Sequence, residues 1–368
     1  MIPVTKTFFP PLEQYNEQLK RIWQNKWLTN RGELVKELET RLKNNLGVPN
    51  VTLTTNGTLP IQIALKVLAG GGEVITTPFS YVATTAAIVW ENCTPVFVDI
   101  HPEYLTIDET KIEAAITDKT TAILATHVFG NPCNVDEIEK IAKKYNLKVI
   151  YDAAHCYGVK YKGEIIFNYG DVSTCSFHAT KLFHTGEGGA MFCKNEELNH
   201  KLFYSHNFGH NGPEDFFGVG INAKMSELQA AMGLSILPYM EDILEARKEI
   251  VTFYDKHLDF TQVTKLKLRE DTEWNYSYYP VIFKNEQELL KVQKALNKKE
   301  IFPRRYFYPS LNTLKYIKAG KMPVSEKMAS RILCLPLFHD LIIERVKLIC
   351  DLINDGLNSN LTSNIKTL

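Results

Sequence analysis

The chain has 368 residues, of which 42 are basic and 42 acidic, and hydrophobic residues make up 45% of it. This composition is typical of a globular protein and excludes disordered and collagen-like classes, while the zero formal net charge lacks the electrostatic footprint of a nucleic-acid-binding protein. Its apolar runs are shorter than the about 18 to 20 residues of a membrane span, and residues 1–11 do not resemble a signal peptide. We therefore expect a cytoplasmic protein without a membrane segment.

Between residues 51 and 194, short apolar runs alternate with segments of helical periodicity. This alternation predicts a largely parallel sheet covered by helices. Strands are expected at 51–55, 73–77, 94–100, 122–128, 148–153 and 172–177. Helices are expected at 60–68, 82–90, 109–116 and 134–145.

A second, smaller unit is expected in the C-terminal part, because a chain of this length exceeds the roughly 250 to 300 residues at which single cores stop growing. A glycine- and asparagine-rich loop at 206–220 is followed by helical periodicity over 225–257. Beyond it we expect a strand at 278–283 and helices at 286–299 and 342–357. The predicted domains are 1–258, which includes the N-terminal segment, and 259–368.

Seven cysteines are scattered without a Cys-x-x-Cys pair, which predicts reduced, partly buried thiols rather than disulfides or a zinc ribbon. His206 and His210 are four residues apart, a spacing that would place two zinc ligands on one face of a helix. Gly209 and Gly212 favour a loop instead, so no metal site is expected.

The strand at 148–153 runs into a carboxylate, Asp152. Ligands bind at the carboxyl ends of strands in a parallel sheet, which would place Asp152 at a binding crevice, although a cap for the next helix explains the residue equally well. Lys181 follows the strand at 172–177 and precedes the glycine-rich turn 186–189. Most lysines are solvated surface groups. However, an amine that forms a Schiff base and a carboxylate that keeps a pyridine nitrogen protonated are the pair that pyridoxal phosphate requires.

Three further features fit this cofactor. Ala154 is small enough to lie flat against one face of a pyridine ring, and Tyr81 is able to stack on the other face. Gly57 and Thr58, at a strand-to-helix junction, offer backbone N–H groups and a hydroxyl to a phosphate. Each feature alone has an ordinary structural explanation, as a turn or as a core aromatic. Their order along an alternating α/β chain favours one common site.

The chain resembles the pyridoxal-phosphate-dependent nucleotide-sugar aminotransferases of the DegT/StrS type over nearly its whole length. The segments that carry the resemblance are WLTNRG at 27–32, TNGT at 55–58, PFSYVAT at 78–84, VDIHP at 98–102, HVFG at 127–130, DAAH at 152–155, SFHATK at 176–181, GEGG at 186–189 and NAKMSELQAA at 222–231. The resemblance implies the aspartate-aminotransferase fold (fold type I), an α/β fold with a large, mostly parallel sheet domain and a smaller C-terminal α/β domain.

The resemblance also implies roles for individual residues. Lys181 would form the Schiff base, Asp152, which we expect to be ionised, would face the pyridinium, and His155 would lie near the phenolic oxygen. Tyr81 would cover the ring, Ala154 would lie under it, and the phosphate would be bound by Gly57, Thr58 and Ser176. Asn222 would reach the phosphate of the neighbouring subunit, which implies a homodimer with shared active sites. One departure is Lys224, where the family usually has arginine; lysine lacks the planar fork of a bidentate contact.

The sequence around the lysine favours one branch of the family. Members that aminate carbon 4 of a keto sugar read Ser-Phe-His-x-x-Lys followed by Gly-Glu-Gly-Gly, as this chain does, whereas carbon-3 enzymes read Ser-Phe-Tyr-Pro-Gly-Lys. The segment PRRYFYPSL at 303–311 resembles the viosamine-forming enzymes. The resemblance to the family implies substrate contacts from Thr29, His178, Arg305 and Tyr306.

The implied reaction moves an amino group from L-glutamate to carbon 4 of dTDP-4-keto-6-deoxy-D-glucose and gives dTDP-4-amino-4,6-dideoxy-D-glucose for a surface glycan such as the O-antigen. Two alternatives are a 3-aminotransferase of the same family that acts on a 3-keto-6-deoxysugar and a catalytically silent nucleotide-sugar-binding homologue. A related dehydratase branch carries histidine at the position of Lys181, and the lysine argues against it.

Overall fold

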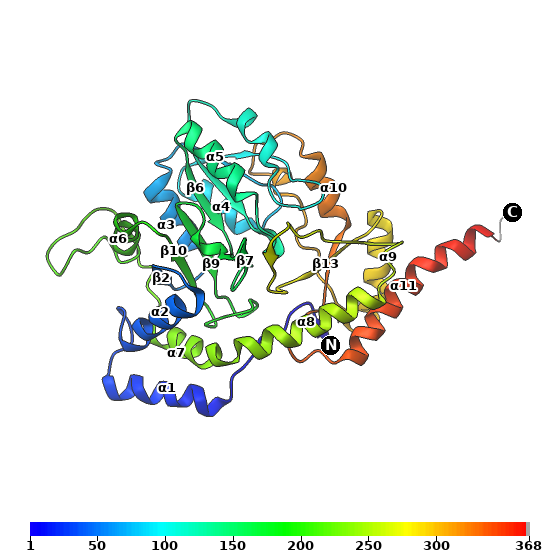
Figure 1. Ribbon diagram of the computed structural model, residues 1–368, viewed down its shortest axis with the longest axis horizontal. Coiled ribbons are helices and arrows are strands. Elements are labelled where there is room, and N and C mark those ends of the chain that lie inside the picture. Colours follow the sequence, from blue (N-terminus) through cyan, green and yellow to red (C-terminus); the bar gives the residue numbers. More distant parts are fainter. Residues whose placement is uncertain (366–368) are drawn as a thin grey trace.

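A computed structural model describes residues 1–365 as an α/β protein built around a seven-stranded sheet (Figure 1). The strand order is β2-β10-β9-β6-β5-β3-β4; β10 runs antiparallel to both of its neighbours, and the other pairings are parallel. The strands are β2 (Val51–Thr54), β3 (Glu73–Thr76), β4 (Thr94–Phe97), β5 (Thr120–Thr126), β6 (Lys148–Asp152), β9 (Val172–Ser176) and β10 (Gly189–Phe192). The predicted fold class, a large and mostly parallel sheet domain, is confirmed.

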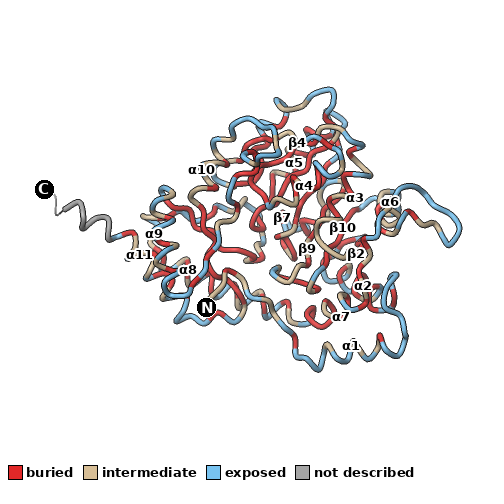
Figure 2. The backbone as a smooth tube through the Cα atoms, turned by 180° about the vertical axis from the view of Figure 1, so that it is seen from behind, coloured by how far each residue is buried: buried red, intermediate tan, exposed pale blue. Residues whose placement is uncertain are grey.

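Helices cover both faces of this sheet because successive side chains of a strand point to opposite faces. In β5, Ile123 and Ala125 pack into the core formed with α2, α5 and α7, while Ala122 and Leu124 pack against α3, α4 and α6. Figure 2 shows this buried layer at the centre of the molecule. The helices are α1 (Leu12–Asn25), α2 (Glu33–Leu46), α3 (Leu59–Leu68), α4 (Val82–Trp90), α5 (Val135–Tyr145), α6 (Glu196–Ser205), α7 (Glu227–Ile236) and α8 (Met240–His257).

The C-terminal part forms a second core. It contains the antiparallel sheet β11-β13-β15 and the helices that pack on it, and the second half of α8 contributes Ile250 and Tyr254. The N-terminal strand β1 (Ile2–Pro3) pairs in parallel with β14 (Ile301–Phe302), so both ends of the chain contribute to this part. Its elements are β11 (Thr264–Lys265), β13 (Tyr279–Ile282), α9 (Glu286–Asn297), α10 (Pro323–Arg331), β15 (Ile332–Leu335) and α11 (Ile343–Ile365). The domain boundary at residue 258 stays a prediction.

A small three-stranded sheet combines strands from both parts of the chain. It consists of β7 (Lys160–Tyr161), β8 (Glu164–Ile165) and β12 (Thr272–Glu273), in the order β12-β7-β8.

Some predicted elements differ in the structure. The helix expected at 109–116 is a pair of short 3₁₀ turns, because Asp108 caps a single turn and Ile116 is already extended, with ψ of 133°. The helical segment 225–257 is divided by a 3₁₀ turn at Leu237–Tyr239, where Pro238 interrupts the helical hydrogen bonds. The seven cysteines are buried free thiols, as predicted. Within residues 1–365, no helix is long and apolar enough to cross a membrane.

Candidate active site

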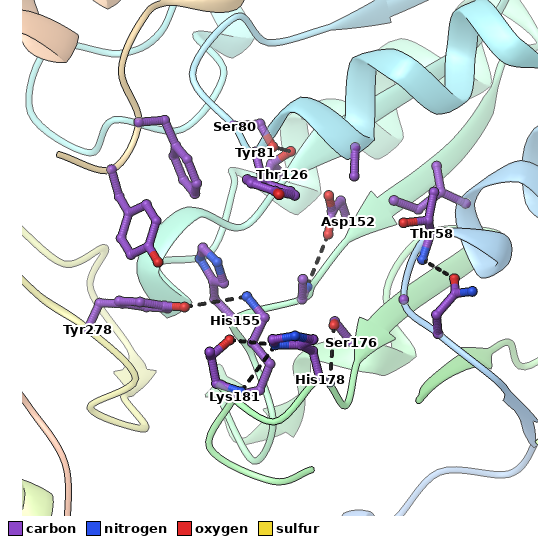
Figure 3. A pocket seen from close by; sticks show the side chains of 18 of the residues that line it. Thr58, Ser80, Tyr81, Thr126, Asp152, His155, Ser176, His178, Lys181 and Tyr278 are labelled. Carbon is purple, nitrogen blue, oxygen red and sulfur yellow. Dashed lines mark hydrogen bonds between the residues drawn. The ribbon is translucent and has the colours of Figure 1, made fainter. Parts of the chain in front are cut away.

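A cavity of about 260 Å³ opens at the carboxyl end of the parallel strands. Residues from both parts of the chain line it, as Figure 3 shows for Asp152 at the end of β6 and Tyr278 just before β13. The structure brings most of the predicted site residues together in its wall: Gly57, Thr58, Tyr81, Asp152, Ala154, His155, Ser176, His178, Lys181 and Tyr306.

Lys181 lies in the turn that connects β9 to β10. Backbone hydrogen bonds fold this turn back on itself: the N–H of Lys181 donates to the carbonyl of His178 (2.8 Å) and that of Ala179 to Gly186 (2.7 Å). Gly186 has a φ of +80°, a conformation that glycine adopts without strain. The half-buried Lys181 side chain points into the cavity, and its Nζ donates to Oη of Tyr278 at 3.4 Å (Figure 3). The turn therefore presents an amine to the cavity.

Asp152 is a buried carboxylate at the cavity wall. Its Oδ2 accepts a hydrogen bond from Oγ1 of Thr84 (2.6 Å), and its Oδ1 accepts one from the N–H of Ala154 (3.1 Å). Burial raises the pKa of Asp152, while the two hydrogen bonds and the positive charge of Lys181 oppose this increase. A cation bound in the cavity would further favour the ionised form. The surroundings of Asp152 thus suit a cationic ligand.

His155 is held as a neutral hydrogen-bond donor. The N–H of Phe129 donates to its Nδ1 (3.0 Å), which places the ring proton on Nε2. Burial lowers the pKa of His155 well below its usual value, so the ring stays uncharged. The ring stacks on Phe307, with centroids 5.8 Å apart, and packs against Tyr278 at 4.6 Å.

The loop between β2 and the ten-residue helix α3 forms a cradle at the other end of the cavity. Oδ1 of Asn56 accepts the N–H groups of Thr58 (2.9 Å) and Leu59 (3.0 Å) and so shapes the loop. Gly57 approaches Ser176 so closely that a Cβ would lie 2.5 Å from its Cβ and 2.9 Å from its Cα. A glycine is therefore required here. Together the glycine backbone, two hydroxyls and the positive end of a helix suit a phosphate.

Tyr81, the residue before α4, lies across the cavity from Lys181 in Figure 3 and has 58% of its surface exposed.

The set of side chains in the cavity fits pyridoxal phosphate: a lysine amine, a carboxylate for a cationic ring nitrogen, a neutral imidazole donor, an exposed aromatic ring and a phosphate cradle. Among the described residues, no group of three or more histidine, cysteine or acidic side chains is arranged to hold a metal ion.

Three predicted site residues do not line this cavity. Thr29 lies in the loop between α1 and α2, and Asn222 is exposed, with its Oδ1 accepting a hydrogen bond from Lys224 (2.7 Å). Arg305 turns away: it forms an ion pair with Glu286 (2.5 Å) and stacks on the ring of Tyr308. The neighbouring Arg304 lies in the cavity wall instead.

Several residues of the cavity wall were not predicted from the sequence. Arg304 lines the cavity because adjacent residues of an extended segment point to opposite sides, and its backbone pairs with Cys334 of β15. Tyr278 was identified only as part of a strand. Ser80, within the motif at 78–84, also lines the cavity. Thr84 of the same motif lies behind Asp152 and donates to it, a contact that nothing in the spacing indicated.

Fold and site together define a pyridoxal-phosphate enzyme of fold type I. The chain matches the model of the DegT/DnrJ/EryC1/StrS aminotransferase family over residues 12–354, and it belongs to this family. It is a pyridoxal-phosphate-dependent aminotransferase.

Individual relatives agree with this assignment. A Shigella dysenteriae protein named dTDP-4-amino-4,6-dideoxy-D-glucose transaminase is 40% identical over 345 residues, which cover 92% of this chain and 94% of the relative. A GDP-perosamine synthase of Escherichia coli O157:H7 is 31% identical over 344 residues, with the same coverage. The solved structure of DesI in the presence of its TDP-sugar product is similar with a TM-score of 0.92 and 30% identity, over 99% of this chain and 95% of that one.

Proposed function

We propose that this aminotransferase moves the amino group of L-glutamate to carbon 4 of dTDP-4-keto-6-deoxy-D-glucose, and that the product, dTDP-4-amino-4,6-dideoxy-D-glucose, serves cytoplasmic synthesis of a surface glycan such as the O-antigen. The observation that carries the transaminase chemistry is the placement of Lys181 and Asp152 on one cavity that also contains a phosphate cradle. The 40% identity to the Shigella transaminase and the His178-containing motif support the choice of sugar.

The residues that line the cavity have different roles in this reaction. When bound, pyridoxal phosphate supplies a cationic ring that withdraws electrons from the carbon that loses a proton. Asp152 would maintain the charge of that ring, and Gly57, Thr58 and Ser176 would bind the phosphate. Lys181 would hold the cofactor covalently until the amino donor displaces it, and its freed amine would then act as the general base and acid that takes up the α-proton of glutamate and gives it back. Nε2 of His155 donates towards the phenolic oxygen.

Substrate preference tests this proposal directly. With added cofactor and L-glutamate, the purified protein is expected to aminate dTDP-4-keto-6-deoxyglucose, with kcat/KM at least about tenfold above that for its 3-keto isomer or a GDP-linked 4-keto sugar. Chromatography with mass spectrometry measures the products. Preference for the 3-keto isomer would instead identify a 3-aminotransferase. If glutamate fails to bleach the visible absorbance of the bound cofactor, the chain is a silent binding homologue.

A homodimer with shared sites is the second part of the proposal. The loop after α6 projects from the body of the molecule (Figures 1 and 2) and exposes large apolar side chains, among them Phe216 (58%), Phe217 (60%) and Val219 (74%). Such a patch is unusual on a monomer and favours contact with a second copy. Asn222 follows this loop, and its exposed side chain would be available to the cofactor phosphate of the partner subunit.

Mixing two inactive variants tests whether Asn222 serves the partner. In a heterodimer of Lys181→Ala and Asn222→Ala chains, one site carries both lesions and the other carries neither, so activity is expected to reappear, up to about half the wild-type activity per heterodimer. The matched control pairs Lys181→Ala with Asp152→Asn, which lie on the same cavity, and no recovery is expected there. Absence of recovery for the first pair, with subunit exchange verified by native mass spectrometry, would place Asn222 at the site of its own chain.

A further inference from the structure

Three buried hydroxyls form a hydrogen-bonded chain that ends on Asp152. Oγ1 of Thr126 donates to Oγ of Ser80 (3.1 Å), Ser80 contacts Oγ1 of Thr84 (2.7 Å), and Thr84 donates to Oδ2 of Asp152 (2.6 Å). The four side chains come from the end of β5, the segment 80–84 that leads into α4, and the end of β6, and each is at most 5% exposed. Buried polar groups destabilise a protein unless each has a hydrogen-bond partner, and in this network each hydroxyl has one.

The donor direction of these hydrogen bonds follows from the carboxylate of Asp152, on which they end. An ionised carboxylate accepts hydrogen bonds and donates none, so the proton of the Thr84 hydroxyl points at Oδ2. The lone pairs of Thr84 then accept from Ser80, and those of Ser80 accept from Thr126. Every hydroxyl donates once towards Asp152, and this common orientation strengthens the last hydrogen bond.

The second oxygen of Asp152 is also held. The N–H of Ala154 donates to Oδ1 (3.1 Å), so each oxygen has one donor and the plane of the carboxylate is fixed. Asp152, Ser80 and Thr126 line the cavity, whereas Thr84 lies outside its lining, behind the carboxylate. The remaining lone pairs of Asp152 are left for a group in the cavity.

We propose that Thr84, supported by Ser80 and Thr126, is a positioning residue that holds Asp152 as an oriented, acceptor-only carboxylate for the cationic ring nitrogen of the cofactor. This inference rests on the cofactor dependence of the enzyme and is independent of which sugar it aminates. It assigns a role to hydroxyls that do not themselves contact the ring nitrogen.

The other titratable groups around Asp152 are few among the described residues. Lys181 is the cation that acts on it electrostatically. The thiols of Cys156 and Cys175 lie close enough to interact with it, but burial raises the pKa of both, so they remain neutral. Nearby His155 is neutral as well. Donors to a carboxylate lower its pKa, so removal of the Thr84 hydroxyl is expected to raise the pKa of Asp152.

The test measures cofactor binding without any sugar. Thr84→Val keeps the shape of the side chain and removes its donor. Its dissociation constant for pyridoxal phosphate, titrated by absorbance at pH 8, is expected to increase about tenfold or more. As the pH is lowered, the affinity for the cofactor is expected to begin to decline about one pH unit higher than in the wild type, because Asp152 without the Thr84 hydroxyl is protonated at a higher pH. Thr84→Ser is expected to restore both properties.

The neighbouring Thr85 provides a matched control. It is also buried on α4, but its Oγ1 has no hydrogen-bond partner among the described residues, so Thr85→Val is expected to leave affinity and pH profile unchanged. In an Asp152→Asn background, Thr84→Val is expected to cause no shift of the acid limb, since no carboxylate titrates there. A similar loss in Thr85→Val, or failure of Thr84→Ser to rescue, would indicate a general packing role and overturn the proposal.

Unchanged affinity and an unshifted acid limb in Thr84→Val would also overturn it. If Thr84→Val does not fold, Ser80→Ala is the second test. It is expected to shift the acid limb of cofactor affinity in the same direction by a smaller amount, and the absence of such a shift counts against the inference. A wild-type protein that binds no pyridoxal phosphate would contradict the assigned cofactor rather than the hydroxyl chain, while a different preferred sugar would leave the whole test intact.

Discussion

Lys181→Ala is expected to lower turnover at least about 10⁴-fold, because the structure places this amine in the cavity and, among the described residues, no other lysine lines it. The variant loses both the covalent attachment of the cofactor and the base that moves the proton. The loss is measured as single-turnover bleaching of the cofactor absorbance by glutamate, together with steady-state product formation.

The fold of this variant should be intact. Lys181 contributes a single side-chain hydrogen bond, to Tyr278 at 3.4 Å, so the thermal unfolding temperature is expected to change little. Lys140→Ala is the matched control, since this exposed lysine forms an ion pair with Glu137 on the surface of α5 and should retain wild-type turnover. Transamination by Lys181→Ala at a rate near the wild type would show that the catalytic amine has been misassigned.

Asp152→Asn is expected to lower turnover by about 10² to 10³-fold, which corresponds to about 3 to 4 kcal/mol of lost electrostatic stabilisation. The amide has nearly the size of the carboxylate but carries no charge for the ring nitrogen. Stopped-flow measurement of each half-reaction, with cofactor occupancy determined by absorbance, separates slower chemistry from weaker binding.

The substitution Asp152→Asn is also expected to lower the stability of the fold. Both oxygens of Asp152 accept hydrogen bonds, from Thr84 and Ala154, and an asparagine can satisfy one of these donors with its oxygen while its NH₂ faces the other. A loss of about 1 to 3 kcal/mol in the free energy of unfolding is therefore expected. Asp136→Asn, at an exposed ion pair with Lys162, is the control and should change neither property. A fully loaded Asp152→Asn enzyme with normal half-reactions would exclude the assigned role.

The residues with distinctive chemistry could be predicted before the fold was known. Lys181, Asp152 and Gly57 lie at junctions between a strand and a turn or helix, and parallel strands bring such junctions to one edge of a sheet. The cavity confirms that they meet. Their roles towards the cofactor, and those of Asn222 and Thr29, stay predictions.

Contacts between distant segments were not predictable in the same way. Whether Arg304 or Arg305 enters the cavity depends on the register with which residue 304 pairs with Cys334 of β15. The hydroxyl of Tyr278 reaches Lys181 only because the C-terminal part of the chain packs against the carboxyl ends of the strands.

The amino-acid sequence by itself determined the alternation of strands and helices, the order of the motifs and the identity of the amine and carboxylate. These properties depend on local periodicity and on chemistry that a few residue types possess. The tertiary structure alone decided that β1 pairs with β14, that residues 109–115 form 3₁₀ turns and that Thr126, Ser80 and Thr84 align on Asp152. The physical reason is that threonine and serine are common and chemically unspecific, so their function arises from the hydrogen-bond partner that long-range packing places beside them.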